Sequence, residues 1–208
     1  MRKLQLLSLL AVFTISACKQ DNVFYRNLDF IVQEPKNDSP INYSVYLIGD
    51  AGGDTSKSKY ALNFLKKQLS KSDSKKTAAV FLGDNIYPEG LHKKDHSLRT
   101  QDEARIDAQI DVVKKFDGEV LFIPGNHDWQ RGNELGLEFI KREEDYIQKK
   151  LDRKVFKPSD GCSGPEEIEL SNALTMIVID TQWWLHKFEK SRGEKDDCAL
   201  RTKAGFLA

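Results

Sequence analysis

Four apolar runs of strand length recur along this chain, and each ends abruptly at polar residues. One of them, residues 78–82, ends at Gly83-Asp84-Asn85. Near-continuous runs of Val, Ile, Leu and Phe are typical of strands that are covered on both faces. Because helical patterns separate the runs, the sequence predicts an α/β fold in which the sheet is sandwiched between helices.

The other three runs also end at residues with the chemistry of metal ligands. Residues 43–48 lead into Asp50, residues 120–123 into Asn126 and His127, and residues 174–179 into Asp180. In open α/β sheets, ligands bind beyond the carboxyl ends of the strands. We therefore expect Asp50, Asp84 and Asn126 to converge at one edge of the sheet.

Three stretches carry apolar residues at helical spacing, and they predict helices over residues 58–70, 102–116 and 134–151. The charge run at residues 141–145 is most simply a solvated helix face. Trp183 and Trp184, which follow the fourth strand, either cover the sheet edge or line a substrate pocket.

The predicted edge has the residues that phosphoryl transfer needs. Carboxylate and amide oxygens next to an imidazole suit iron, zinc or manganese. Two such ions clamp the attacking and leaving oxygens of a phosphoryl displacement, and a carboxylate on a middle strand can bridge them. His127 would protonate the leaving group or bind the developing charge, with Asp128 holding its ring. Gly52 and Gly53 leave backbone room for a phosphate.

The segments 49–53, 83–87 and 125–128, in this order, resemble the first three motifs of the calcineurin-like metallophosphoesterases. The Gly-Gly pair after Asp50 and the position of Tyr87, three residues after Asp84, further resemble the purple acid phosphatase branch. The resemblance implies an α/β sandwich around a dinuclear centre of iron, manganese or zinc. Asp50 and Tyr87 would bind the first ion, Asp84 would bridge, and Asn126 would bind the second.

In the same reading His127 is the acid of the site, and Asn85 joins Gly52 and Gly53 in binding substrate. The family also carries later metal histidines, a single one and then a Gly-His-x-His motif. This chain has four histidines, none of them in that motif. We therefore expect residues 41–208 to be an incomplete phosphoesterase domain whose C-terminal part is missing.

The remaining histidines have simpler interpretations. His186 follows its strand too closely to match the later motif, so a packing or rim role is expected. His92 and His96 lie in a lysine-rich loop and are expected to be solvated, with a substrate contact as the alternative.

The N-terminus has the pattern of an export signal. Arg2 and Lys3 precede an apolar stretch at residues 4–15 and small residues before Cys18. This resembles a bacterial lipoprotein signal over residues 1–17, which implies lipidation of Cys18 in the cell envelope. Lys19 favours the outer membrane; an ordinary signal peptide or N-terminal anchor is the alternative. Residues 18–40 are a polar tether or, around residues 24–32, an edge strand.

The charge balance and the cysteine content limit which partners and which covalent links are expected. Lys plus Arg equals Asp plus Glu at 32 each, so no nucleic-acid partner is expected. Cys162 and Cys198 remain once Cys18 is assigned to lipid, and in an oxidising compartment they predict a disulfide, with two free thiols as the alternative.

The predicted function is hydrolysis of phosphomonoesters by metal-bound hydroxide, acting on a phosphorylated small molecule. A phosphodiester, nucleotide or pyrophosphate substrate is the alternative within the same chemistry. A different class is a non-catalytic envelope lipoprotein that binds a partner or a phosphorylated ligand. A further alternative is that the chain is the front of a larger envelope protein.

Overall fold

The computed structural model describes residues 40–191 and residue 198. The predicted signal peptide, the lipidated Cys18 and the tether up to residue 39 therefore lie outside the described residues. Residues 41–208 form a unit of their own. Within the described part of this unit, no helix is long and apolar enough to cross a membrane.

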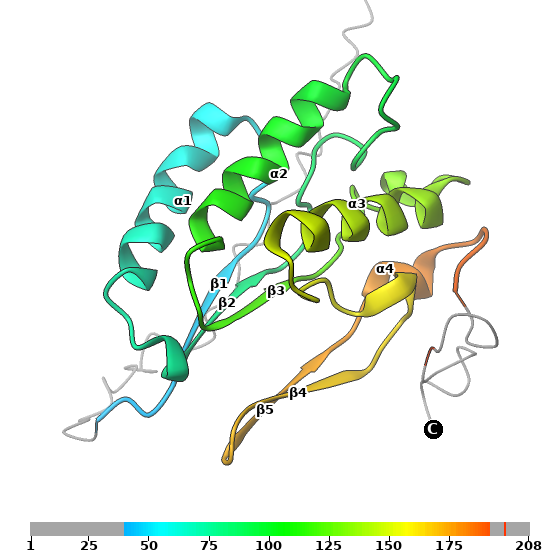
Figure 1. The fold of residues 1–208 in the computed structure, drawn as a ribbon. Helices are drawn as coiled ribbons and strands as arrows, with labels where there is room; N and C mark the ends of the chain where they lie inside the picture. Colours follow the sequence, from blue (N-terminus) through cyan, green and yellow to red (C-terminus); the bar gives the residue numbers. More distant parts are fainter. Residues whose placement is uncertain (1–39, 192–197, 199–208) are drawn as a thin grey trace, which may run out of the picture. The chain divides into compact units, whose positions relative to one another are not determined.

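Three parallel strands form the central sheet: β1 (Ser44–Ile48), β2 (Thr77–Phe81) and β3 (Glu119–Phe122), in the order β1-β2-β3 (Figure 1). β2 lies in the middle and is buried along its whole length. Ile48 pairs with Phe81, and Phe81 pairs with Phe122, so the three strands end level with one another. The loops that follow them therefore leave from the same edge.

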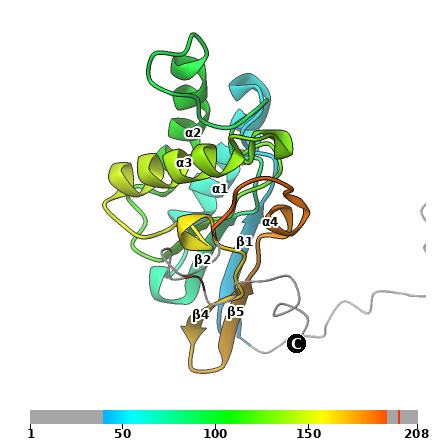
Figure 2. The same ribbon diagram turned by 90° about the vertical axis from the view of Figure 1, so that its right-hand side faces the viewer.

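Three long helices lie on one face of this sheet: α1 (Thr55–Leu69), α2 (Arg99–Val113) and α3 (Gly136–Leu151), as Figures 1 and 2 show. They bury alternate strand residues, and the rings of Phe81 and Phe122 stack with their centroids 4.3 Å apart. The helical side chains in this core include Leu62, Leu65, Ile106, Ile110, Ile140 and Ile147. Asp54 caps α1 by accepting a hydrogen bond from the Ser56 backbone N–H.

The other face of the sheet carries a β-hairpin instead of helices. β4 (Glu166–Ser171) and β5 (Leu174–Val178) pair antiparallel, and Val178 packs against Val80 and Leu121. The class prediction, α/β, is confirmed. The expected second helical layer is absent from the described residues, where all three long helices lie on one face. The fourth apolar run was expected in the covered sheet, but it pairs with β4.

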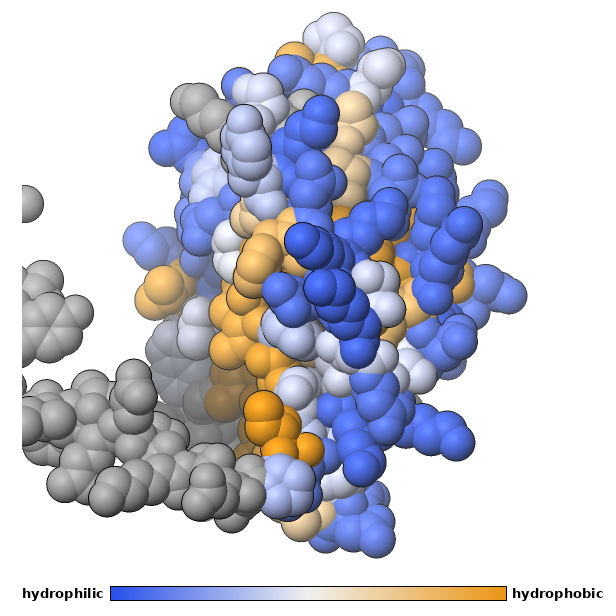
Figure 3. Space-filling model, turned by 90° about the vertical axis from the view of Figure 1, so that its left-hand side faces the viewer, coloured by the Kyte–Doolittle hydropathy of each residue, from blue (hydrophilic) through white to orange (hydrophobic). Residues whose placement is uncertain are grey.

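This face keeps apolar side chains in contact with solvent. Leu47 on β1 is 61% exposed on this face, and Ile177 on β5, next to the inward-facing Val178, is 60% exposed on the outer side of the hairpin. Ile41, Leu82 and Ile179 are exposed as well. Figure 3 shows an apolar band on the side of the molecule that it presents. The sheet is therefore only partly covered opposite the helices.

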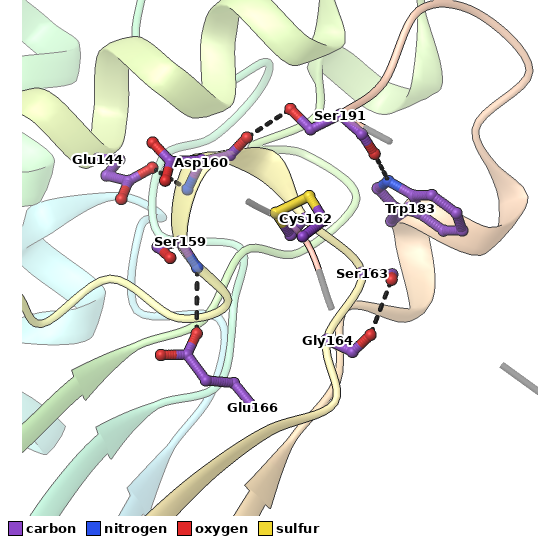
Figure 4. Close-up of a disulfide and its surroundings, with 10 residues drawn as sticks. Glu144, Ser159, Asp160, Cys162, Ser163, Gly164, Glu166, Trp183 and Ser191 are labelled. Atoms are coloured by element: carbon purple, nitrogen blue, oxygen red, sulfur yellow. Dashed lines mark hydrogen bonds between the residues drawn. A yellow bond between two sulfur atoms is a disulfide. The ribbon is translucent and has the colours of Figure 1, made fainter. Parts of the chain in front are cut away.

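The short helix α4 (Thr181–Leu185) follows β5, and a disulfide ties the segment after it back to the start of β4. Cys162 and Cys198 form this bond, with their Cα atoms 5.4 Å apart, which confirms the predicted pair (Figure 4). In the same region, the Ser191 hydroxyl donates a hydrogen bond to the Asp160 carbonyl, and the Trp183 Nε1–H donates one to the Ser191 carbonyl.

Candidate metal centre at the strand ends

Two aspartates stand directly after the first two strands, in loops that hold each other. The backbone N–H of Asp50 donates to the Gly83 carbonyl at 3.1 Å, and that of Gly52 donates to the Asp84 carbonyl at 3.0 Å. Asp50 and Asp84 have φ angles of 55° and 53°, in the left-handed region that non-glycine residues rarely adopt. The chain therefore turns sharply at both carboxylates.

The side chains of Asp50 and Asp84 meet at one phenol. The Tyr87 hydroxyl lies 2.6 Å from Asp50 Oδ1 and 2.8 Å from Asp84 Oδ2. Its single proton can satisfy only one of these oxygens at a time. Burial first, and then the two carboxylates, raise the pKa of Tyr87. The three predicted ligands Asp50, Asp84 and Tyr87 are thus brought together at the sheet edge.

Asn126 lies on the wall of a cavity that Asp50 and Asp84 also line. This cavity has a volume of about 650 Å³, and Asp50, Asp84 and Asn126 all line it. Asn126 is exposed, as a ligand-binding amide at a sheet edge would be. We call Asp50, Asp84, Tyr87 and Asn126 the strand-end site.

His127 is held by a backbone oxygen. Its Nδ1 lies 2.6 Å from the Pro88 carbonyl, and its ring packs against Tyr87 with centroids 4.2 Å apart. Its backbone N–H donates to Asp84 Oδ1 at 3.1 Å. The prediction that Asp128 holds this ring is therefore wrong, because the Pro88 carbonyl occupies Nδ1.

Asp128 instead joins two loops from inside. It is fully buried, and its carboxylate accepts backbone N–H groups from Gly125 at 2.7 Å, Asn85 at 3.1 Å and Ile86 at 3.0 Å. Burial raises the pKa of Asp128 to about 7, although these three donors lower it. Asp128 is therefore a structural clamp between the second and third loops, and the geometry gives it no contact with a substrate.

Asn85 also points into the interior. Its amide nitrogen donates to the Ile123 carbonyl at 2.9 Å and to Glu143 Oε1 at 3.2 Å, and the residue is fully buried. The prediction that Asn85 binds substrate is wrong for this reason. Its partner Glu143, on α3, is buried too, and burial together with Asp128 raises the pKa of Glu143.

The two glycines of the first loop differ in role. A Cβ at Gly52 would lie 2.1 Å from the Asn85 carbonyl group, so Gly52 is required for the first loop to pack against the second. A Cβ at Gly53 would meet no atom within 4 Å. Gly53 thus remains the residue with open space around it, as a phosphate approach needs, whereas the space at Gly52 is filled by protein.

The donor set decides which ions the strand-end site fits. In residues 40–191 and 198, no group of three or more His, Cys, Asp or Glu side chains could hold a metal ion. The donors that do converge are two carboxylates, a phenol and an amide. These are hard oxygen ligands, and the shared phenol proton marks a point where a cation would relieve the crowding of negative charge.

The other histidines are mostly buried. His186 is 2% exposed and packs on Trp129 with ring centroids 4.8 Å apart, in agreement with a packing role. The prediction of a solvated His92 is wrong, because it is buried with its Nδ1 2.7 Å from Asp102 Oδ2. His96 is exposed and stacks on His92.

The indole groups of Trp129 and Trp183 are both buried. Trp129 donates its Nε1–H to Asp180 Oδ2 at 2.7 Å. This bond links the loop after β3 to the start of α4. Asp180 is buried in this bond and is not among the residues that line the cavity, although it follows an apolar run like the other acids.

Two residues of the cavity were missed by sequence reasoning. Arg131, which is exposed, and Gln182 on α4 both line it. Arg131 lies three residues after Asp128, so its place in the motif loop was the available signal.

Comparison of the chain with protein-family models, with curated proteins and with solved structures finds no match.

Proposed function

We propose that residues 41–208 carry a metal-dependent phosphomonoesterase site of the calcineurin-like metallophosphoesterase type. The observation that carries this proposal is the meeting of Asp50 and Asp84 at the Tyr87 hydroxyl, at the carboxyl ends of parallel strands. The exposed Asn126 on the same cavity wall supports it.

Each residue of the site has a role in this reaction. Asp50, Asp84, Tyr87 and Asn126 would hold divalent or trivalent ions of iron, manganese or zinc. When bound, these ions supply an activated water and neutralise charge on the phosphoryl group.

The protein's own groups would do the rest. The Pro88 carbonyl fixes the His127 ring through Nδ1, which leaves Nε2 of the protonated ring to give its proton to the leaving oxygen. Arg131 would bind the phosphoryl oxygens of a phosphorylated small molecule through its planar fork of N–H groups.

Metal binding and turnover test this proposal together. Purified chain is titrated with Mn²⁺, Fe²⁺ and Zn²⁺ by calorimetry, and hydrolysis of an aryl phosphate is then measured with each ion. We expect Asp84→Asn to lose both metal binding and turnover, because it removes the carboxylate shared between the loops. The control is Asp95→Asn, which alters an exposed aspartate outside the cavity. Wild-type chain that binds none of the three metals would overturn the proposal.

A second candidate is favoured by the donor count. Because no group of three or more His, Cys, Asp or Glu among the described residues could hold a metal ion, the site in this second candidate would bind a phosphorylated ligand without hydrolysing it. Metal-supported binding of inorganic phosphate with no turnover of aryl phosphate would select this non-catalytic function.

The proposed location is the bacterial envelope, through lipid on Cys18. Intact mass of the native protein, compared with Cys18→Ser, tests the anchor. A mature wild-type mass without added acyl chains would contradict it.

A further inference from the structure

A second cavity, distinct from the strand-end site, lies between α2 and α3. Its volume is about 1030 Å³, and six of the residues that line it are cationic: Lys93, Lys94, Arg99, Arg142, Lys149 and Lys150. Glu103 and Asp145 are its acidic residues, which leaves a local excess of four positive charges. The whole chain has a formal net charge of zero, so this excess is a local feature. We call this cavity the α2–α3 pocket.

Two arginines form the less exposed part of the pocket. Arg99 is 7% exposed, and its Nη1 donates to the His92 carbonyl while its Nε donates to Glu103 Oε1 at 2.7 Å. Arg142 donates from Nη1 to the Leu91 carbonyl at 2.6 Å, and its Nη2 lies 3.6 Å from Glu138 Oε2. These bonds fix both guanidinium groups but leave N–H donors for a further acceptor, since each group has five.

The two guanidinium groups also repel each other. Burial lowers the pKa of Arg142, and the charge of Arg99 lowers it further, against the opposing effect of Glu138. Like charges held close in a partly buried place are unfavourable unless an anion compensates them. It is the hydrogen bonds of Arg99 and Arg142, described above, that hold the two cations in place for an anion.

The exposed lysines extend this field to the mouth of the pocket. Lys93 lies 3.5 Å from Glu138 and Lys150 lies 3.2 Å from Asp107, so these two are paired. The side chains of Lys94 and Lys149 have no hydrogen bond or ion pair with any described residue. They remain available for a ligand that carries several negative charges.

The residues that line the α2–α3 pocket favour a small phosphate anion over a nucleic acid. A nucleic acid needs exposed aromatic faces for stacking and an extended basic stripe. The aromatic residue of this pocket, Tyr146, already has Arg99 and Lys150 over its ring, at 5.3 Å and 5.0 Å from the centroid. The volume is that of a small-molecule site. Guanidinium forks and ammonium groups together match clustered phosphate oxygens.

We propose that the α2–α3 pocket binds a multivalent phosphate anion of the pyrophosphate or tripolyphosphate class. Arg99 and Arg142 contact one phosphate group at the base, and Lys94 and Lys149 contact another at the mouth. The site is independent of the function proposed for the strand-end site, because the two share no lining residue.

Calorimetric titration of metal-free chain with tripolyphosphate at low salt tests this site. We expect one anion per chain, and at least tenfold weaker binding for Arg142→Gln and for the pair Lys94→Gln/Lys149→Gln. The matched control pair is Lys67→Gln/Lys115→Gln, which removes two exposed charges elsewhere. Asp84→Asn is expected to bind like wild type, which separates this pocket from the strand-end site.

Equal affinity of the pocket pair and the control pair would overturn the proposal, as would no binding by wild type. The lysine pair lies at the surface, so it decides the matter even where Arg142→Gln fails to fold. A third measurement uses vesicles of phosphatidylglycerol and of phosphatidylcholine. Binding to the anionic vesicles that depends on Lys94 and Lys149, with none to tripolyphosphate, would assign the pocket to a lipid headgroup and overturn the free anion.

Discussion

Asp128 shows how one buried carboxylate can set the shape of a site that it does not enter. It accepts three backbone N–H groups from two loops, one carrying Asp84 and the other carrying Asn126. Both candidate ligands therefore depend on the same internal acceptor. Its effect on function is indirect, through the positions of the two loops.

We predict that Asp128→Ala lowers the free energy of unfolding by about 3 kcal/mol or more, because three amide groups lose their buried acceptor. Urea denaturation at pH 6, followed by tryptophan fluorescence, measures the change. Asp95→Ala, in an exposed loop, should stay within about 0.5 kcal/mol of wild type. A stability loss no larger than that of Asp95→Ala would contradict the clamp.

Arg131 is the cationic residue that lines the strand-end cavity. In the proposed function it binds the phosphoryl oxygens of the substrate. We expect Arg131→Ala to raise KM for an aryl phosphate about tenfold with a smaller change in kcat, because a charge-assisted contact to phosphate is lost. Arg131→Lys should recover part of the loss. Steady-state kinetics with the best metal measure both constants, and an unchanged KM would remove Arg131 from substrate binding.

The convergence of the candidate ligands at one sheet edge could be predicted from the sequence, but the directions of their neighbours could not. Asp50, Asp84 and Asn126 follow strands directly, so level strand ends bring them to one edge. Asn85 comes directly after Asp84 and yet points inward. Its direction depends on the left-handed turn at Asp84 and on the acceptor Glu143, which lies 58 residues further along the chain.

Among the elements, α3 carries the unexpected chemistry, because its inner face includes two acids. Glu144 Oε2 accepts the Asp160 backbone N–H at 2.8 Å, a contact visible in Figure 4. Burial, followed by the charges of Asp160 and Asp145, raises the pKa of Glu144 to about 7. The prediction that residues 141–145 form a solvated helix face is therefore wrong for Glu143 and Glu144, which are both buried.

This raised pKa predicts how stability changes with pH. The folded chain keeps the Glu144 proton at pH values where the unfolded chain has lost it. The stabilising contribution is therefore complete below about pH 4.5 and is lost as the pH rises through about 7. Between pH 5 and pH 8, wild type should lose on the order of 2 kcal/mol relative to Glu144→Gln. Urea denaturation at both pH values tests this, and parallel curves for the two proteins would contradict it.

The helices were easier to predict than the strand partners. The 3.6-residue period located α1, α2 and α3 to within about three residues, because one apolar stripe of each helix faces the sheet. α2 begins earlier than predicted, at Arg99, where Leu98 gives no side-chain cap to mark the start. β4 was missed, although residues 166–171 alternate charged and apolar side chains. An apolar run does not indicate which strand it pairs with. β5 was therefore predicted to lie in the helix-covered sheet, whereas it pairs with β4.

For the molecule as a whole, the disulfide is the long-range covalent link in the described residues. Cys162→Ser/Cys198→Ser should lower the free energy of unfolding by about 3 to 4 kcal/mol, as expected for a closed loop of 36 residues. Chemical reduction of wild type should give the same loss in urea denaturation. Loss of less than about 1 kcal/mol would contradict this expected stabilisation.

The α/β class and the level strand ends could be read from repeated apolar runs. The one-sided helical layer and the hairpin opposite it could not, since the same runs suit strands covered by helices or by other strands. Leu47 stays exposed on that second face, and a sequence pattern does not distinguish such a side chain from a buried one.

The left-handed backbone at Asp50 and Asp84 costs folding stability at the two positions where the proposed function needs a carboxylate. Glycine adopts such angles without steric penalty, and exchange at either position would also remove one of two crowded acids. Asp50→Gly and Asp84→Gly would relieve the backbone strain but lose the hydrogen bonds that these carboxylates accept, so thermal selection alone gives no reason to keep these two candidate ligands.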